Sequence, residues 1–203
     1  MGGFSRVSLT HVPETTTDPA HARFAGNISI DLPPNRPEIQ RSGYGAWRTL
    51  DRSATVFGRS LWDIDPYSYL ALKIKSDGRK YFINIQTESI VPTDLHQHRL
   101  YASKPGEWET VIVSFNEFVR TNHGMVVEPQ KDMMRQRVRS FGIGLIDRIP
   151  GPFDIRIAEI YATNDSGGKK VPTSEESEKF EMFGELGDEK KGRKEGEPEK
   201  ILI

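Results

Sequence analysis

The chain has 203 residues, of which 35% are hydrophobic and 28% charged, and its formal net charge is −1. It contains no cysteine, which excludes disulfides, thiolate metal sites and cysteine nucleophiles. The near-zero net charge gives no overall attraction to nucleic acid or to an anionic membrane surface, and no apolar run approaches the roughly 18–20 residues of a membrane-spanning helix. Residues 1–6 have neither an apolar signal core nor the arginine-rich character of an organellar presequence. The residues alone therefore leave open both a cytosolic protein and one whose leader has been removed.

The body of the chain, residues 1–164, has the pattern of an antiparallel β-protein. Gly, Pro, Asn and Asp interrupt it about every 8 to 14 residues, as is typical of a sandwich or barrel. In 67–75 and 80–88 apolar and polar residues alternate, and Asp77-Gly78 between them predicts a hairpin turn. Only 116–119 has helical character. We predict one all-β domain with strands at 22–32, 43–51, 67–75, 80–88, 108–114, 138–147 and 153–162.

Residues 165–203 form a tail of different composition, rich in charged residues, glycine and proline. Such a segment buries too little apolar surface to offset the entropy of ordering, so we predict a charged, mostly disordered tail. Thr173–Glu176 forms a capping-box sequence, and Phe180, Phe183 and Leu186 follow at near-helical spacing. The sequence thus predicts a short amphipathic helix over 173–186 that docks into an apolar groove of a partner.

Several segments of the body resemble one known family and occur in its order. They are Phe24-Ala25-Gly26-Asn27-Ile28-Ser29, Arg41-Ser42-Gly43-Tyr44, Asp77-Gly78-Arg79-Lys80-Tyr81, Asn84-Ile85-Gln86-Thr87, Gly106-Glu107-Trp108-Glu109-Thr110-Val111, Phe115-Asn116-Glu117-Phe118, Ile143-Gly144-Leu145-Ile146-Asp147 and Gly151-Pro152-Phe153. Together they resemble the complex I intermediate-associated protein 30 family over residues 2 to about 162.

This resemblance implies a jelly-roll β-sandwich of the galactose-binding-like kind. It also implies a non-catalytic assembly factor that chaperones membrane-arm intermediates of respiratory complex I. The implied location is the mitochondrial matrix, peripheral to the inner membrane, with Met1 as an engineered or trimmed start. The implied partners are complex I membrane-arm subunits together with complex I intermediate-associated protein 84 in fungal systems, or with ECSIT and an acyl-CoA dehydrogenase homologue in animal ones.

Three arginines are candidate partner-binding residues in the body. Arg135, Arg137 and Arg139 alternate in the sequence, and on a strand they would form a basic stripe facing one way. Such a stripe would meet an acidic partner or a phosphate. The alternative is a charged strand edge that prevents aggregation. The other candidate partner-binding residues are Phe180, Phe183 and Leu186 of the tail.

The sequence also contains residues that could bind a metal ion or a sugar. Asp94, His96 and His98 would share one face of a strand and offer a metal two imidazoles and a carboxylate. The favoured alternative is a solvated edge with polar residues facing out, because no further ligand occurs at the spacing that zinc sites use. A sugar-binding platform, as in a jelly-roll carbohydrate-binding module, is the alternative function. Its aromatic residues would be Tyr44, Trp47, Trp62, Tyr67, Tyr81 and Trp108.

The search for catalytic groups finds no paired acid and base and no nucleophile elbow. Gly142-Ile143-Gly144-Leu145 lacks the third glycine and the following helix of a nucleotide-binding loop. Asp63 and Asp65 lie in a turn, where aspartate is common without any bound cation. We therefore expect no cofactor, no catalytic residue and no resident metal, and a protein that works by contact.

Overall fold

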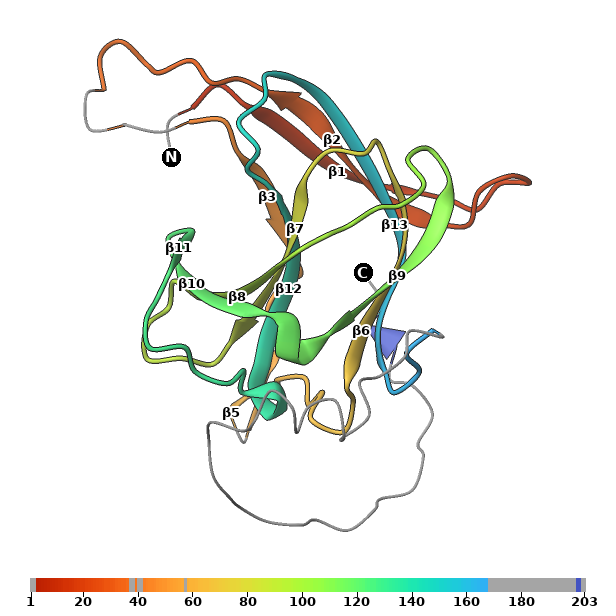
Figure 1. Ribbon diagram of the computed structural model, residues 1–203, viewed down its shortest axis with the longest axis vertical. Coiled ribbons are helices and arrows are strands. Elements are labelled where there is room, and N and C mark those ends of the chain that lie inside the picture. The colour runs from red at the N-terminus through yellow and green to blue at the C-terminus, as the bar shows by residue number, and fades with distance from the viewer. Residues whose placement is uncertain (1–2, 37–38, 40–41, 57, 168–199, 202–203) are drawn as a thin grey trace, which may run out of the picture.

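The fold was analysed in a computed structural model that describes residues 3–36, 39, 42–56, 58–167 and 200–201. Two antiparallel sheets lie face to face (Figure 1). The first has the order β1 (Arg6–Val12), β2 (His21–Ile28), β13 (Gly151–Thr163), β6 (Tyr69–Ser76) and β9 (Trp108–Ser114), with β14 (Lys200–Ile201) paired to β13. The second has the order β11 (Met125–Val126), β10 (Val119–Asn122), β8 (Asp94–Arg99), β7 (Tyr81–Thr87), β12 (Val138–Leu145) and β3 (Gly45–Arg48). A separate pair joins β4 (Ala54–Thr55) to β5 (Gly58–Arg59).

The core lies between the two sheets because apolar and polar residues alternate along the strands. β7 shows this clearly, since Tyr81, Ile83 and Ile85 are buried while residues 82, 84 and 86 are only partly so. Successive side chains of a strand point to opposite faces, so one set packs inward and the other faces out. The fully buried side chains come from both sheets and include Phe24, Leu70, Leu72, Ile74, Tyr81, Phe141, Ile143 and Leu145. The predicted all-β jelly-roll sandwich is confirmed.

Two local predictions differ from the structure. The helical segment predicted at 116–119 is instead a 3-10 turn, η1 (Phe115–Glu117). The hydroxyl of the preceding Ser114 accepts a hydrogen bond from the Asn116 backbone N–H. The chain then enters β10 at Val119. The predicted hairpin at Asp77-Gly78 is also wrong, because β6 and β7 belong to opposite sheets. The turn exists, with Gly78 at φ +87°, but it carries the chain across the end of the sandwich.

Arg79 holds this crossing in place. Its guanidinium donates two hydrogen bonds to the carboxylate of Asp147, at 3.0 and 2.7 Å. The remaining three N–H groups donate to the backbone carbonyls of Ile149, Gly151 and Pro152. All five donors of the guanidinium are thus used. Arg79 therefore ties the β6–β7 crossing to the β12–β13 crossing at the same end of the molecule.

The described chain continues past the predicted domain boundary. The Asn164 side chain accepts a hydrogen bond from the Ser68 N–H and donates one to the Pro66 carbonyl. Gly167, at φ +61°, lies so close to Ile112 that a Cβ there would be 2.4 Å from its Cδ1. The predicted helix over 173–186, with Phe180, Phe183 and Leu186, lies outside the described residues, and the disorder of that stretch stays a prediction. None of the helices described is long and apolar enough to cross a membrane.

Candidate functional site

The outward face of the second sheet carries a row of polar side chains above a glycine-containing strand. In the strand register Gly142 of β12 pairs with Asn84 of β7 on one side and with Arg48 of β3 on the other. Asn84 in turn pairs with Gln97 of β8. Paired residues share a face, so Gln97, Asn84 and Arg48 point to the same side, away from the core.

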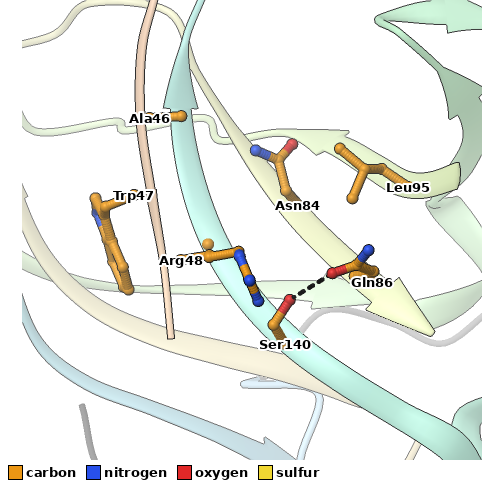
Figure 2. Close-up of a pocket in the computed structure, with 8 residues that line it drawn as sticks. Ala46, Trp47, Arg48, Asn84, Gln86, Leu95 and Ser140 are labelled. Carbon is orange, nitrogen blue, oxygen red and sulfur yellow. Dashed lines mark hydrogen bonds between the residues drawn. The ribbon is translucent and has the colours of Figure 1, made fainter. Parts of the chain in front are cut away.

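A hollow of about 230 Å³ lies on this face, and we call it the amide trough (Figure 2). Gly142 lines the hollow, and Gly144 follows two residues later on β12, where a Cβ would lie 3.0 Å from the Asn84 Nδ2 and 3.8 Å from the Ala46 Cβ. A Cβ at Gly142 would lie 2.3 Å from the Trp47 carbonyl oxygen, so only glycine permits β3 to approach β12 this closely. The trough is lined by Ala46, Trp47, Arg48, Asn84, Gln86, Leu95, Ser140 and Gly142.

A chain of hydrogen bonds fixes the orientation of the Asn84 amide. The Thr121 hydroxyl donates to the Gln97 Oε1 at 2.8 Å, and the Gln97 Nε2 donates to the Asn84 Oδ1 at 2.7 Å. The Asn84 oxygen therefore faces Gln97, and its NH₂ group faces β3 (Figure 2). Beside it, Ser140 donates to the Gln86 Oε1 at 3.2 Å, and the Gln86 Nε2 donates to the Pro92 carbonyl.

Two guanidiniums share a single carboxylate at one end of the amide trough. Asp51 accepts hydrogen bonds from Arg48 at 2.6 Å and from Arg139 at 3.0 Å. These hydrogen bonds, from Arg139 first and then from Arg48, lower the pKa of Asp51 to about 2. The cluster therefore holds two positive charges and one negative charge at neutral pH, and the Arg48 side chain remains 54% exposed.

The prediction that Arg135, Arg137 and Arg139 form a basic stripe along a strand is wrong. Arg135 and Arg137 lie in a 3-10 turn, η2 (Arg135–Arg137), and β12 begins only at Val138, so of the three arginines only Arg139 is on the strand. Each is paired within the chain: Arg135 with Asp65, Arg137 with Glu88 and Arg139 with Asp51. Their part in partner binding stays a prediction, and Arg139 alone adjoins the amide trough.

The aromatic residues considered for sugar binding do not form one platform. Tyr81 is fully buried in the core. Trp108 belongs to the first sheet and donates to the Asp18 carboxylate at 2.6 Å. Trp62 packs edge-on against Phe141, and Tyr67 and Trp47 pack partly buried against the core. Tyr44 is 43% exposed at the edge of the second sheet.

Asp94, His96 and His98 share one face of β8, as their alternation predicts, but this face points into the sandwich. Asp94 accepts hydrogen bonds from Arg120 at 2.6 Å and from Asn122 at 2.8 Å, and His96 is buried. The metal reading gains no support, since within the described ranges no three His, Asp or Glu side chains are placed to hold an ion. Of the two turn carboxylates, Asp63 accepts a hydrogen bond from the Asp65 N–H and Asp65 accepts one from Gln136.

The burial of His96 predicts a pH-dependent stability. Desolvation, and then the positive charge of Arg120, lower the pKa of His96 below its usual value. In the unfolded chain His96 takes up a proton below pH about 6.5, whereas in the folded chain it stays neutral to a lower pH. The neutral, buried His96 therefore contributes its full stability above pH about 6.5, and this stability is lost as the pH falls toward the pKa of His96 in the folded protein. Urea unfolding across this range is expected to show the loss. His96→Gln should reduce it, whereas His11→Gln, at an exposed site on β1, should leave the profile as it is.

The family model described as complex I intermediate-associated protein 30 matches residues 1–157. The chain belongs to the complex I intermediate-associated protein 30 family. A relative named complex I intermediate-associated protein 30, mitochondrial, from Neurospora crassa is 56% identical over 153 residues, which cover 75% of this chain and 55% of the relative. A relative of the same name from Mus musculus is 28% identical over 170 residues, covering 81% and 50%. The chain thus spans about half the length of these relatives.

Solved structures that resemble this family member include carbohydrate-binding modules. A family 11 module from Clostridium thermocellum, in complex with a β-1,3-1,4-mixed-linked tetrasaccharide, has a TM-score of 0.47 at 16% identity and covers 77% of this chain and 84% of its own. The family 11 module of a cellulosomal cellulase from the same organism has a TM-score of 0.48 at 16% identity, with coverages of 77% and 83%.

Sequence reasoning missed the amide trough, although a signal for it was present. Asn84 and Gln86 belong to a segment that carries the family resemblance, and they sit at the outward positions of an alternating strand. Gly142 and Gly144 occupy the equivalent positions two residues apart on β12. What the sequence could not supply is the pairing of β7 with β12, which brings Asn84 beside Gly142 and Gln86 beside Ser140.

Proposed function

We propose that this chain acts in the assembly of mitochondrial respiratory complex I as a non-catalytic, protein-binding scaffold for membrane-arm intermediates. The observation that carries this proposal is membership of the complex I intermediate-associated protein 30 family across residues 1–157. The relatives are named mitochondrial, which supports a mitochondrial location. We place the protein in the matrix, peripheral to the inner membrane.

The geometry of the second sheet supports action by contact. The amide trough presents hydrogen-bonding groups held by the Thr121–Gln97–Asn84 chain, so little conformational entropy is lost when they meet a partner. Neither a nucleophile with an adjacent base nor a group of metal ligands lines the trough among the residues described. A preorganised polar surface of this kind suits recognition between proteins.

The identity values favour a partner of the fungal type. The chain is 56% identical to the Neurospora relative and 28% identical to the mouse one. We therefore propose complex I intermediate-associated protein 84, rather than ECSIT and an acyl-CoA dehydrogenase homologue, as its companion assembly factor.

A co-purification experiment tests this proposal. This chain would replace the matching segment of the tagged Neurospora relative, which supplies the remaining length, and the chimaera would be isolated from mitochondria. Complex I intermediate-associated protein 84 and membrane-arm subunits are expected in the eluate and not with an unrelated tagged matrix protein. Their absence from the eluate of a folded chimaera would contradict the proposal. Retention of the chain on a polysaccharide affinity gel would favour the carbohydrate-binding alternative instead.

A further inference from the structure

The amide trough offers hydrogen-bond donors and lacks a negative charge of its own. The Asn84 oxygen accepts from Gln97, and the Asn84 Nδ2, which carries the two N–H donors, lies on the side of Gly144. Arg48 lines the same hollow from β3, on the other side of β12. Among the residues described, no Asp or Glu lines it. The ligand that complements such a site is an oxygen acceptor with negative charge.

The charges beside the amide trough also favour a negatively charged ligand. Asp51 binds Arg48 from outside the trough and is shared with Arg139, so one positive charge of the cluster is not balanced. Because the Arg48 side chain is 54% exposed, its guanidinium has donors to spare for a second carboxylate. A guanidinium and a carboxylate form the strongest kind of charge-assisted hydrogen bond in proteins.

The remaining lining indicates where the acceptor comes from. Leu95 and Ala46 border the trough with apolar surface, which suits the methylene groups of a side chain better than it suits a free inorganic anion. The volume of about 230 Å³ admits a side chain and not a folded element. The hollow also lies on the outward face of the second sheet, away from the core, which is the side that a partner chain can reach.

We propose that the amide trough binds the carboxylate of an acidic side chain, glutamate above all, presented by a partner polypeptide. Asn84 and Arg48 donate to the carboxylate oxygens from opposite walls. Gln97 and Thr121 act as positioning residues, because they hold the Asn84 amide with its NH₂ group toward the trough. This inference rests on the proposed protein-binding function and deepens it, but its test uses the isolated chain and can fail independently.

The test is a titration of the ¹⁵N-labelled full chain followed by NMR. The probes are the capped tripeptide Gly-Glu-Gly, its glutamine counterpart Gly-Gln-Gly, and inorganic phosphate. The glutamate peptide is expected to shift the Asn84 side-chain NH₂ and the Arg48 Nε–H signals, and the glutamine peptide to shift them much less. Equal binding of phosphate and the glutamate peptide would overturn the assignment to a side chain, and the absence of shifts with the glutamate peptide would overturn the site itself.

Matched variants separate binding from folding. Asn84→Asp keeps the shape and the hydrogen bond from Gln97 but places a carboxylate where the donor was, so affinity for the glutamate peptide should fall at least about tenfold. Asn27→Asp makes the same change at an exposed position of the first sheet and should have no effect. Gly144→Ala adds a methyl group 3.0 Å from the Asn84 Nδ2 and should weaken binding without touching any charge. Unchanged affinity in both Asn84→Asp and Gly144→Ala would contradict the proposal.

Discussion

Replacing Arg79 with alanine is expected to lower the free energy of unfolding by about 3–5 kcal/mol, because it leaves a buried carboxylate without its partner. The Asp147 side chain is only 3% exposed and Arg79 only 13%, so water cannot take over the lost hydrogen bonds. Three backbone carbonyls of the β12–β13 crossing lose their donor as well. For a chain of this size the melting temperature should fall by roughly 6–20 °C.

The control for Arg79 is an exposed ion pair. Arg23 pairs with Asp154 at 2.7 Å, but the two side chains are 47% and 31% exposed, so Arg23→Ala should cost no more than about 1 kcal/mol. The double variant Arg79→Met with Asp147→Asn should lose less stability than the sum of the two single changes, since it leaves no unpaired charge. Thermal unfolding of Arg79→Ala, Arg23→Ala, the double variant and its two single variants measures all of these values. An Arg79→Ala protein as stable as Arg23→Ala would show that the crossing is not held by this residue.

Replacing Phe141 with alanine is expected to cost a similar amount, about 3–5 kcal/mol, by a different mechanism. Phe141 is 1% exposed on the inner face of β12 and contacts Trp62 edge-on at 5.6 Å between ring centroids. Its removal leaves a cavity between the sheets that the rigid strands cannot close. Urea unfolding monitored by circular dichroism measures the loss.

Phe141→Leu is the matched control for this cavity, because it keeps most of the apolar volume and should cost clearly less. The amide trough lies on the opposite face of β12, so neither variant removes a group that lines it. A cost for Phe141→Ala as small as that for Phe141→Leu would mean that the core repacks freely around this position.

The alternation of apolar residues was enough to predict most of the sandwich. β6, β7 and β13 contain residues that alternate between core and solvent, and these strands, like β9 and β12, were predicted within a few positions. β1 escaped prediction because six of its seven residues are exposed at the edge of the first sheet, so no buried face marks it. The hairpin at Asp77-Gly78 failed for another reason: a glycine turn shows that the chain reverses, but not whether the next strand stays in the same sheet.

The candidate site was harder to predict because its parts are distant in the sequence. Arg48 and Gly142 are brought together by the pairing of β3 with β12, which local patterns do not encode. The predicted stripe of Arg135, Arg137 and Arg139 failed because residues two apart share a face only within a strand, and this strand starts at Val138. The family resemblance and the alternation of the strand both included Asn84 and Gln86, but neither gave these residues a role.

The most direct test of the central claim, that this chain serves complex I assembly, is complementation of a Neurospora strain lacking its own complex I intermediate-associated protein 30. The chimaera that carries this chain in place of the matching segment would be expressed in that strain, and mitochondrial complexes would be separated on a native gel. Fully assembled complex I is expected to return with the chimaera and to be absent from the strain without it. A stable, mitochondrially located chimaera that leaves membrane-arm intermediates unassembled would contradict the claim.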